Sequence, residues 1–205
     1  MTARDEILAR IRMAAPPDPL PAPASAYRER GQLATAALLD LLADRLTDYR
    51  AAVRRATRAT LATTIAAALS ERGARRLVVP PGLDLPLPDF AEVTIDGALS
   101  AAELDVLDGV ITRAAVAIAE TGTIILDGSA GQGRRAISLV PDYHLCIVGA
   151  DQVVQLVPEA VTRLAGAADR PQTWISGPSA TSDIELERVE GVHGPRTLEV
   201  ILVTG

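Results

Sequence analysis

Between residues 33 and 113 the sequence alternates helical and strand patterns, and this alternation constrains the fold more than any other feature. Leucines recur at helical spacing over residues 33–46, and a second helical pattern over 59–72 stops at Gly73. A capping box of Ser100 with Glu103 opens a further helix. Short runs typical of strands lie beside these helices, at 51–55, 76–80 and 92–95. We therefore predict an α/β domain with a mostly parallel sheet flanked by helices.

The second half of the chain favours further strands, joined by glycine-rich connections, with a helix near residues 158–164. Hydrophobic residues make up 48% of the chain and aromatic residues only 2%. A core built from Ala, Val, Leu and Ile favours helices packed on a sheet. The expected strands cover residues 109–113, 116–119, 123–126, 144–148, 173–176 and 198–203.

The N-terminal residues predict a helical arm on an extended linker. Apolar residues recur at helical spacing over 3–14, and prolines between 16 and 23 prevent the helix from continuing. We assign residues 1–30 to this arm and linker, and residues 31–205 to one α/β domain. Such an arm docks on a partner subunit, packs on its own domain or stays loosely tethered, and the sequence leaves these alternatives open.

Composition excludes several classes of function and site. The net charge is −6 and no dense basic run occurs, so we expect no nucleic-acid partner. All 20 basic residues are Arg, and neither Lys nor Asn occurs, which excludes a Schiff-base lysine, a P-loop lysine and an Asn-linked glycan. The charged N-terminus and the lack of a long apolar run predict a cytoplasmic protein with no membrane partner.

The single cysteine, Cys146, allows no internal disulfide and cannot by itself hold an iron–sulfur cluster. It lies among apolar residues, so we expect a small buried side chain, and we expect a structural role for His144 beside it. No compact metal-binding motif such as H-E-x-x-H is present, so we predict no metal site.

Polar residues surround a glycine between two apolar strands at Glu120, Thr121, Gly122 and Thr123. Gly122 permits close approach of the backbone to a ligand, and Glu120 is a candidate general base, nucleophile or hydrogen-bond acceptor. A polar strand connection with no ligand explains the segment equally well.

The loop at residues 127–135 combines glycines with Arg134 and Arg135, a composition that suits an anion. Its glycine spacing does not match a dinucleotide-binding fingerprint. A flexible exposed loop is the preferred interpretation, and the two arginines remain weak ligand candidates.

The segment from 176 to 196 holds the richest set of polar residues. We predict a turn after a strand, then a short helix over 183–190 capped by Ser182 with Glu185. The N-terminus of a helix at the carboxyl end of a strand favours an anion, although a helix cap alone explains Ser182 and Glu185. The candidate ligand-binding residues here are Ser176, Gly177, Pro178, Ser179, Thr181, Ser182, Asp183 and Glu185.

A cap does not explain the residues that follow. His193, Gly194 and Arg196 place an imidazole and a guanidinium between glycines, just before the last strand. Arg196 is suited to hold a carboxylate or phosphate, and His193 is a second candidate catalytic residue because imidazole exchanges protons near neutral pH. We expect the 120–123 and 176–196 segments to form facing walls of one site.

Taken together, three motifs resemble the lactate-utilisation LUD-domain family, and within it the lactate utilisation protein C branch: AIAETGTIIL, SLVPDYHLCIV and TWISGPSATSDIELERVEGVHGPRTLEVIL. The resemblance spans about residues 105 to 204. It implies a fold like that of glucosamine-6-phosphate deaminases, ribose-5-phosphate isomerases and coenzyme A transferases. It also implies a role in oxidising L-lactate to pyruvate with cysteine-rich partner proteins that carry iron–sulfur clusters, this chain being the cluster-free accessory component.

Two other functions remain open. One is a free-standing enzyme that acts on a small carboxylate- or phosphate-bearing metabolite, with Glu120 as base and Arg196 as anion clamp. The other is a binding module that senses such a metabolite without turning it over.

Overall fold

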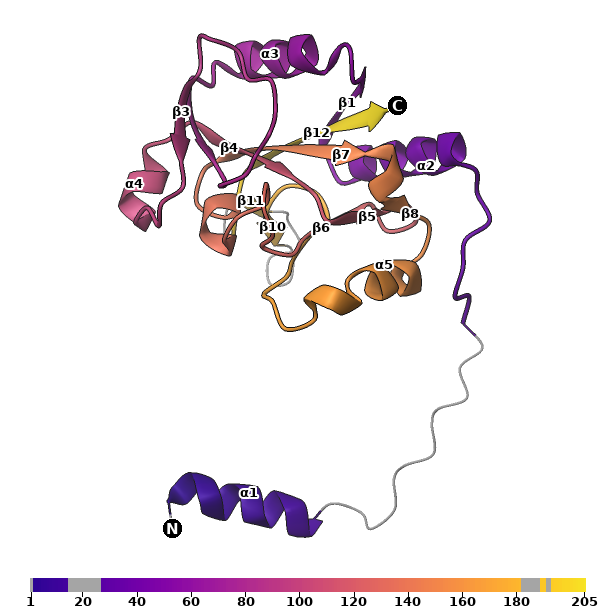
Figure 1. The fold of residues 1–205 in the computed structure, drawn as a ribbon, viewed down its shortest axis with the longest axis vertical. Coiled ribbons are helices and arrows are strands. Elements are labelled where there is room, and N and C mark those ends of the chain that lie inside the picture. Colours follow the sequence, from indigo (N-terminus) through magenta and orange to yellow (C-terminus); the bar gives the residue numbers. More distant parts are fainter. Residues whose placement is uncertain (1, 15–26, 182–188, 191–192) are drawn as a thin grey trace.

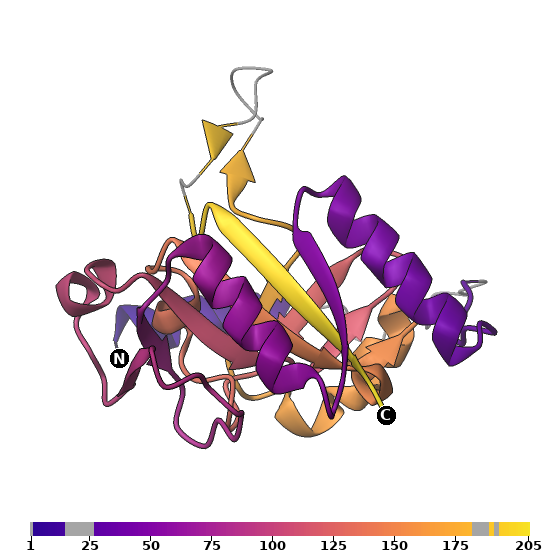
Figure 2. The ribbon, with the colours of Figure 1, turned by 90° about the horizontal axis from the view of Figure 1, so that it is seen from above.

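The computed structural model describes residues 2–14, 27–181, 189–190 and 193–205. Its centre is a six-stranded sheet in the order β1-β12-β7-β4-β2-β3, in which every neighbouring pair is parallel (Figures 1 and 2). The predicted α/β class and parallel sheet are confirmed. The strands are β1 (Ala52–Thr57), β2 (Arg76–Val79), β3 (Glu92–Ile95), β4 (Gly109–Arg113), β7 (Tyr143–Gly149) and β12 (Thr197–Thr204).

Two helices cover opposite faces of this sheet. Side chains of α2 (Thr35–Asp48) pack with Cys146 and Val148 of β7, whereas those of α3 (Leu61–Arg72) pack with Leu145 and Ile147. Alternate residues of a strand point to opposite faces, so β7 supplies both cores and is buried along most of its length. Both helices agree with the prediction, and α3 ends at Gly73 with a left-handed φ of 67°.

A second sheet lies on the α2 side, in the order β8-β5-β6-β9. Its strands are β5 (Val116–Ile118), β6 (Thr123–Leu126), β8 (Val153–Val154) and β9 (Thr173–Ile175). The β5–β6 and β6–β9 pairs are antiparallel. A connection of only a few residues between β5 and β6 permits no other arrangement, because parallel neighbours need a long crossover. Helix α5 (Val157–Arg163) packs on the outer face of this sheet through Ala160.

Shorter elements complete the domain. Helix α4 (Ala101–Asp105) begins with the predicted capping box, in which the amide of Glu103 donates to Ser100 Oγ and the amide of Ser100 to the Glu103 carboxylate. The single-turn helices are η1 (Arg135–Ser138), η2 (Ala150–Gln152) and η3 (Ala165–Ala167).

The helix predicted over 183–190 is wrong where the structure describes it. Val189–Glu190 forms strand β11, paired antiparallel with β10 (Ala180–Thr181). A β-branched residue such as Val189 suits an extended strand, and a partner strand distant in sequence gives it backbone hydrogen bonds that local patterns do not reveal. Ser182, Asp183 and Glu185 lie outside the described residues.

The N-terminal helix α1 (Ala3–Ala14) exists as predicted, and none of its side chains is buried. Residues 28–33, which we call the strap, lie after this helix and are bound to the surface of the domain. The side-chain oxygen of Gln155 accepts the amides of Gln32 and Leu33 at 2.8 and 3.1 Å. A Cβ at Gly31 would lie 2.3 Å from the Gln155 Cβ, so only glycine allows the strap this close. None of the described helices is both long and apolar enough to cross a membrane.

A buried charged cluster ties β1, α3 and β7 to the last strand, β12. The carboxylate of Glu199, which is fully buried, accepts hydrogen bonds from Arg54, from Arg72 Nε at 3.4 Å and from the Tyr143 hydroxyl at 3.0 Å. Burial, followed by the charge of Glu199, holds the pKa of Tyr143 well above its usual range, so its hydroxyl stays protonated and donates. The guanidinium of Arg54 also pairs with the exposed carboxylate of Glu71, at 2.6 Å.

We expect Glu199→Ala to lower the free energy of unfolding by about 1–3 kcal/mol, because it leaves the buried Tyr143 hydroxyl and the half-buried Arg54 guanidinium without their acceptor. Glu71→Ala, which removes an exposed partner of the same arginine, should cost about 1 kcal/mol or less. Urea denaturation of both variants measures the difference. Equal losses would show that Glu199 acts as an ordinary surface ion pair.

Candidate functional site

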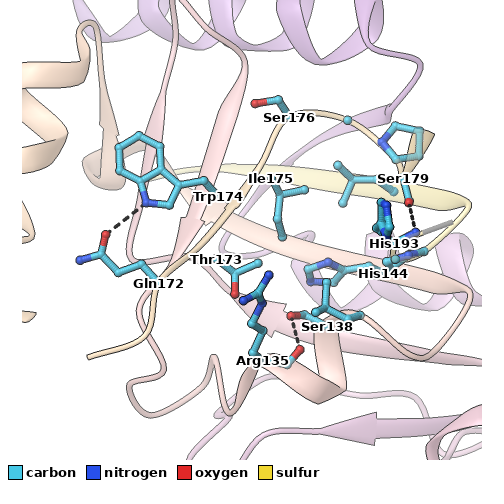
Figure 3. A pocket seen from close by; sticks show the side chains of 16 residues that line it. Arg135, Ser138, His144, Gln172, Thr173, Trp174, Ile175, Ser176, Ser179 and His193 are labelled. Carbon is cyan, nitrogen blue, oxygen red and sulfur yellow. Dashed lines mark hydrogen bonds between the residues drawn. The ribbon is translucent and has the colours of Figure 1, made fainter. Parts of the chain in front are cut away.

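A cavity of about 330 Å³ opens between the two sheets, beside the loop that follows β9 (Figure 3). Its walls come from η1, from β9 and residues 176–179, from residues 193–195 and from the first residues of β7 and β12. The lining residues are Arg135, Ser138, Leu139, His144, Gln172, Thr173, Trp174, Ile175, Ser176, Gly177, Pro178, Ser179, His193, Gly194, Pro195 and Leu198.

The cavity lies at the amino ends of the parallel strands, because His144 and Leu198 are near the starts of β7 and β12. The sequence placed the loop from Ser176 at the carboxyl end of a strand, as in open α/β sheets. The loop does follow the carboxyl end of β9, but β9 belongs to the second sheet, where it pairs antiparallel with β6. Its loop therefore reaches the opposite edge of the parallel sheet.

Two of the predicted ligand-binding stretches meet at this cavity. The amide of Ser179 donates to the Pro195 carbonyl at 2.8 Å, and the amide of His193 donates to Ser179 Oγ at 3.0 Å. These bonds bring 176–179 against 193–195, and Gly194 lines the same cavity. Gly177 has a φ of 83°, and a Cβ there would lie 2.7 Å from Tyr49, so this glycine is required by the turn itself.

The 120–123 segment touches this wall through a chain of hydroxyl groups. Thr123 Oγ1 lies 2.9 Å from Ser176 Oγ and 2.7 Å from Thr121 Oγ1. Neither threonine is among the residues that line the cavity. The two segments are therefore in contact, but the described cavity is lined by residues of the 176–196 segment and not by residues 120–123.

Glu120 is not among the described residues that line the cavity, and its side chain holds the N-terminal strap. Its carboxylate accepts hydrogen bonds from Gln155 Nε2 at 2.9 Å and from Arg28 at 2.8 Å. Both bonds lower the pKa of Glu120, and the bond from Gln155 has the larger effect. A Cβ at Gly122, whose φ is 60°, would lie 2.8 Å from the Arg45 Cβ, so helix α2 explains this glycine. The role of Glu120 as a base stays a prediction.

Arg196 and His193 border a neighbouring hollow of about 520 Å³ that shares His193, Gly194 and Leu139 with the main cavity. The Arg196 guanidinium pairs with Asp142 at 3.2 Å, and both side chains are exposed. His193 is exposed and lies between the two hollows. The backbone of Thr181 forms part of β10.

The two arginines of the 127–135 loop differ in their surroundings. Arg134 is held by Asp96, at 2.7 and 2.9 Å, and by the Leu99 carbonyl. Its guanidinium is the main cause that lowers the pKa of Asp96. The Arg135 side chain has no hydrogen-bonding or ionic partner within the described part of the chain, and it lines both the main cavity and an adjoining hollow of about 280 Å³.

The loop that carries these arginines closes on itself. The amide of Asp127 donates to Gln132, the Gln132 amide group to Ser129, and the amide of Ser129 to the Asp127 carboxylate. Asp127 and Gln132 are buried, so the exposed loop predicted from the sequence is wrong at these positions. Buried polar groups need partners: the loop supplies these three bonds itself, and Arg170 from outside the loop pairs with the Asp127 carboxylate at 2.8 Å.

His144, which the sequence assigned a structural role, has one side in the sheet and one in the cavity. Its Nε2 lies 2.8 Å from Thr112 Oγ1, which also lies 3.7 Å from Cys146 Sγ. Burial lowers the pKa of His144 to about 4 and raises the pKa of Cys146 to about 12, so both side chains are neutral at pH 7. Cys146 is the buried apolar residue that the sequence predicted.

Among the described residues no cluster of His, Cys, Asp and Glu side chains is suited to hold a metal ion. His144 and Cys146 are close to each other, but one imidazole and one buried thiol are too few ligands for a metal site.

The model of the LUD domain family matches residues 39–203. The chain belongs to the LUD domain family. It is 52% identical to "Lactate utilization protein C" of Deinococcus radiodurans over 93% of this chain and 86% of that protein. The protein of the same name from Bacillus subtilis is 35% identical over 46% of this chain and 41% of that protein.

A solved structure supports the same assignment. The crystal structure of a DUF162 family protein from Deinococcus radiodurans has a TM-score of 0.74 and 48% identity to this chain, and the match covers 84% of this chain and 99% of that one. The resemblance that the motifs carried is therefore confirmed. In this LUD domain, those motifs supply Ser176, Ser179 and His193 from one stretch and His144 from another.

Arg134 and Arg135 are adjacent in the sequence, so substituting each gives a matched pair. We expect Arg134→Gln to lower the free energy of unfolding by about 1–3 kcal/mol, because the nearly buried Asp96 loses its charged donor. Arg135→Gln should change it by about 0.5 kcal/mol or less. Urea denaturation tests both. A large loss in Arg135→Gln would indicate a structural role for that side chain.

The stability of the domain should fall as the pH drops from about 6.5 to about 4, because the unfolded chain binds a proton at His144 that the folded chain excludes. Because the pKa of His144 is lower in the folded chain, its contribution to stability is fully present above the pKa of the unfolded chain. Up to about 3 kcal/mol of this contribution is lost as the pH falls toward 4. Urea denaturation at several pH values should show a smaller dependence in His144→Gln. The same dependence in both proteins would contradict a buried neutral imidazole.

Proposed function

We propose that this chain acts in lactate utilisation, as the cluster-free component of an iron–sulfur system that oxidises L-lactate to pyruvate. The observation that carries the proposal is its 52% identity, over 93% of the chain, to a protein named "Lactate utilization protein C". Similarity over nearly the whole chain makes a shared role the simplest hypothesis.

The chemistry of the chain supports the division of labour in this proposal. Oxidation of a secondary alcohol to a ketone releases two electrons and two protons, which an acceptor must take up. A four-thiolate cluster needs more cysteines than the single one in this sequence, and Cys146 is buried as a neutral thiol. We therefore place the clusters on cysteine-rich partner proteins and assign no cofactor to this chain.

The cavity supports a ligand-binding contribution. Among the described lining residues it offers one arginine whose side chain has no described partner, and several hydroxyl groups, a combination that suits a small carboxylate or phosphate. The alternative of a free-standing enzyme with Glu120 as base is weaker, because that carboxylate is engaged by Arg28 and Gln155 and has a lowered pKa.

Deletion of the gene should abolish growth on L-lactate as sole carbon source, and a plasmid copy should restore it. Growth on glucose serves as the control. The tagged chain should also co-purify with proteins that carry iron–sulfur clusters. Normal growth on L-lactate in a strain with no other lactate dehydrogenase would contradict the proposal.

A further inference from the structure

The charge of the cavity restricts the ligand that it accepts. Arg135 is the only side chain of the described lining that carries a permanent charge, and no carboxylate lines the cavity there. A single cation matches a monoanion, whereas a phosphate dianion usually needs more positive charge or several backbone amides. A volume of about 330 Å³ is at the lower end for ligand sites, so the ligand is small.

His144, which lines this cavity, has an unfilled hydrogen-bonding position. The side chain is 1% exposed, and Thr112 satisfies Nε2. Its Nδ1 has no hydrogen-bond partner within the part of the chain that the structure describes. A buried polar atom without a partner costs free energy, so a ligand atom that fills this position gains more than one at the surface.

Figure 3 shows the two groups in one space: Arg135 extends from η1 toward Thr173, and the His144 ring lies between Arg135 and His193 in this view. The side chain of Ser138 lies beside the ring, and Ser179 lies beside His193. Arg135 and the His144 ring therefore line the same small volume.

We propose that this cavity binds a small 2-hydroxy monocarboxylate, with its carboxylate on the Arg135 guanidinium and its 2-hydroxyl on Nδ1 of His144. The Thr112 hydroxyl has one hydrogen, which it donates to Cys146 Sγ, so it accepts from Nε2–H and the neutral ring presents Nδ1 as an acceptor. A 2-hydroxyl donates to this nitrogen, whereas a keto oxygen has no hydrogen to donate. The inference rests on the lactate-utilisation function proposed above and names the ligand class and the residues that hold it.

The test is calorimetric titration of the purified full-length chain at pH 7 with L-lactate, propionate, pyruvate and inorganic phosphate. L-lactate should bind saturably. Propionate lacks only the 2-hydroxyl and should bind about fivefold more weakly or worse, as pyruvate should. Arg135→Gln should weaken L-lactate binding about tenfold or more, because it removes a charge-assisted contact. Arg75→Gln, an exposed arginine outside the cavity, is the matched control and should bind as the parent does.

Nuclear magnetic resonance reports on His144 without substituting it. The chain has two histidines, so comparison with His193→Gln assigns both imidazole signals. L-lactate should shift the His144 ring resonances, and it should not do so in Arg135→Gln at the same concentration. A circular dichroism melt of each variant verifies that it is folded.

Several results would overturn the proposal: no saturable binding of L-lactate below about 10 mM, unchanged binding in Arg135→Gln, propionate or pyruvate binding as tightly as L-lactate, or a preference for phosphate. The proposed function is tested separately by growth. A deletion strain that fails on L-lactate, together with a chain that binds no lactate, would reject this ligand assignment alone. Specific binding with normal growth of the deletion strain would support the site and reject the function.

Discussion

The packing of the second sheet against one face of the parallel sheet is the interaction on which the site depends. Ala117, Ile124 and Leu126 of the second sheet share one buried core with Cys146 and Val148 of β7. This core holds β9 at a fixed distance from the starts of β7 and β12, so the loop after β9 crosses the amino edge of the parallel sheet. The hydrophobic effect thus sets the position of the cavity, and the polar residues only line it.

Hydrogen-bonding capacity separates the residues that hold the fold from those that remain open for a ligand. Glu120 and Arg134 are polar residues in loops of the LUD domain, yet both are fully engaged, one with the strap and the other with Asp96. Arg135 and His144 retain capacity that no described residue uses. Since a buried polar group without a partner is costly, this difference is a physical reason to place ligand binding at the latter pair.

The charge and the cysteine chemistry of the chain bear on the kind of ligand that the cavity suits. A buried, neutral Cys146 offers no thiolate, and among the described residues that line the cavity Arg135 is the one with a fixed charge. A single cation suits recognition of a small anion. The ligand class that we propose for the cavity rests on the similarity to proteins named for lactate utilisation, and the one cation of the described lining is consistent with it.

The sequence by itself determined the elements of the fold and the family, because apolar periodicity, the Ser100 capping box and Gly73 act locally, within a few residues. It also brought together 176–179 and 193–194, through motif residues that do line one cavity. Only the tertiary structure decided that β9 pairs antiparallel with β6, that Val189–Glu190 is a strand, and that Glu120 faces the strap. It likewise decided that Arg134 pairs with Asp96 and that Arg135 does not. These outcomes depend on partners distant in the chain, and two adjacent arginines carry no local signal of which one finds a carboxylate.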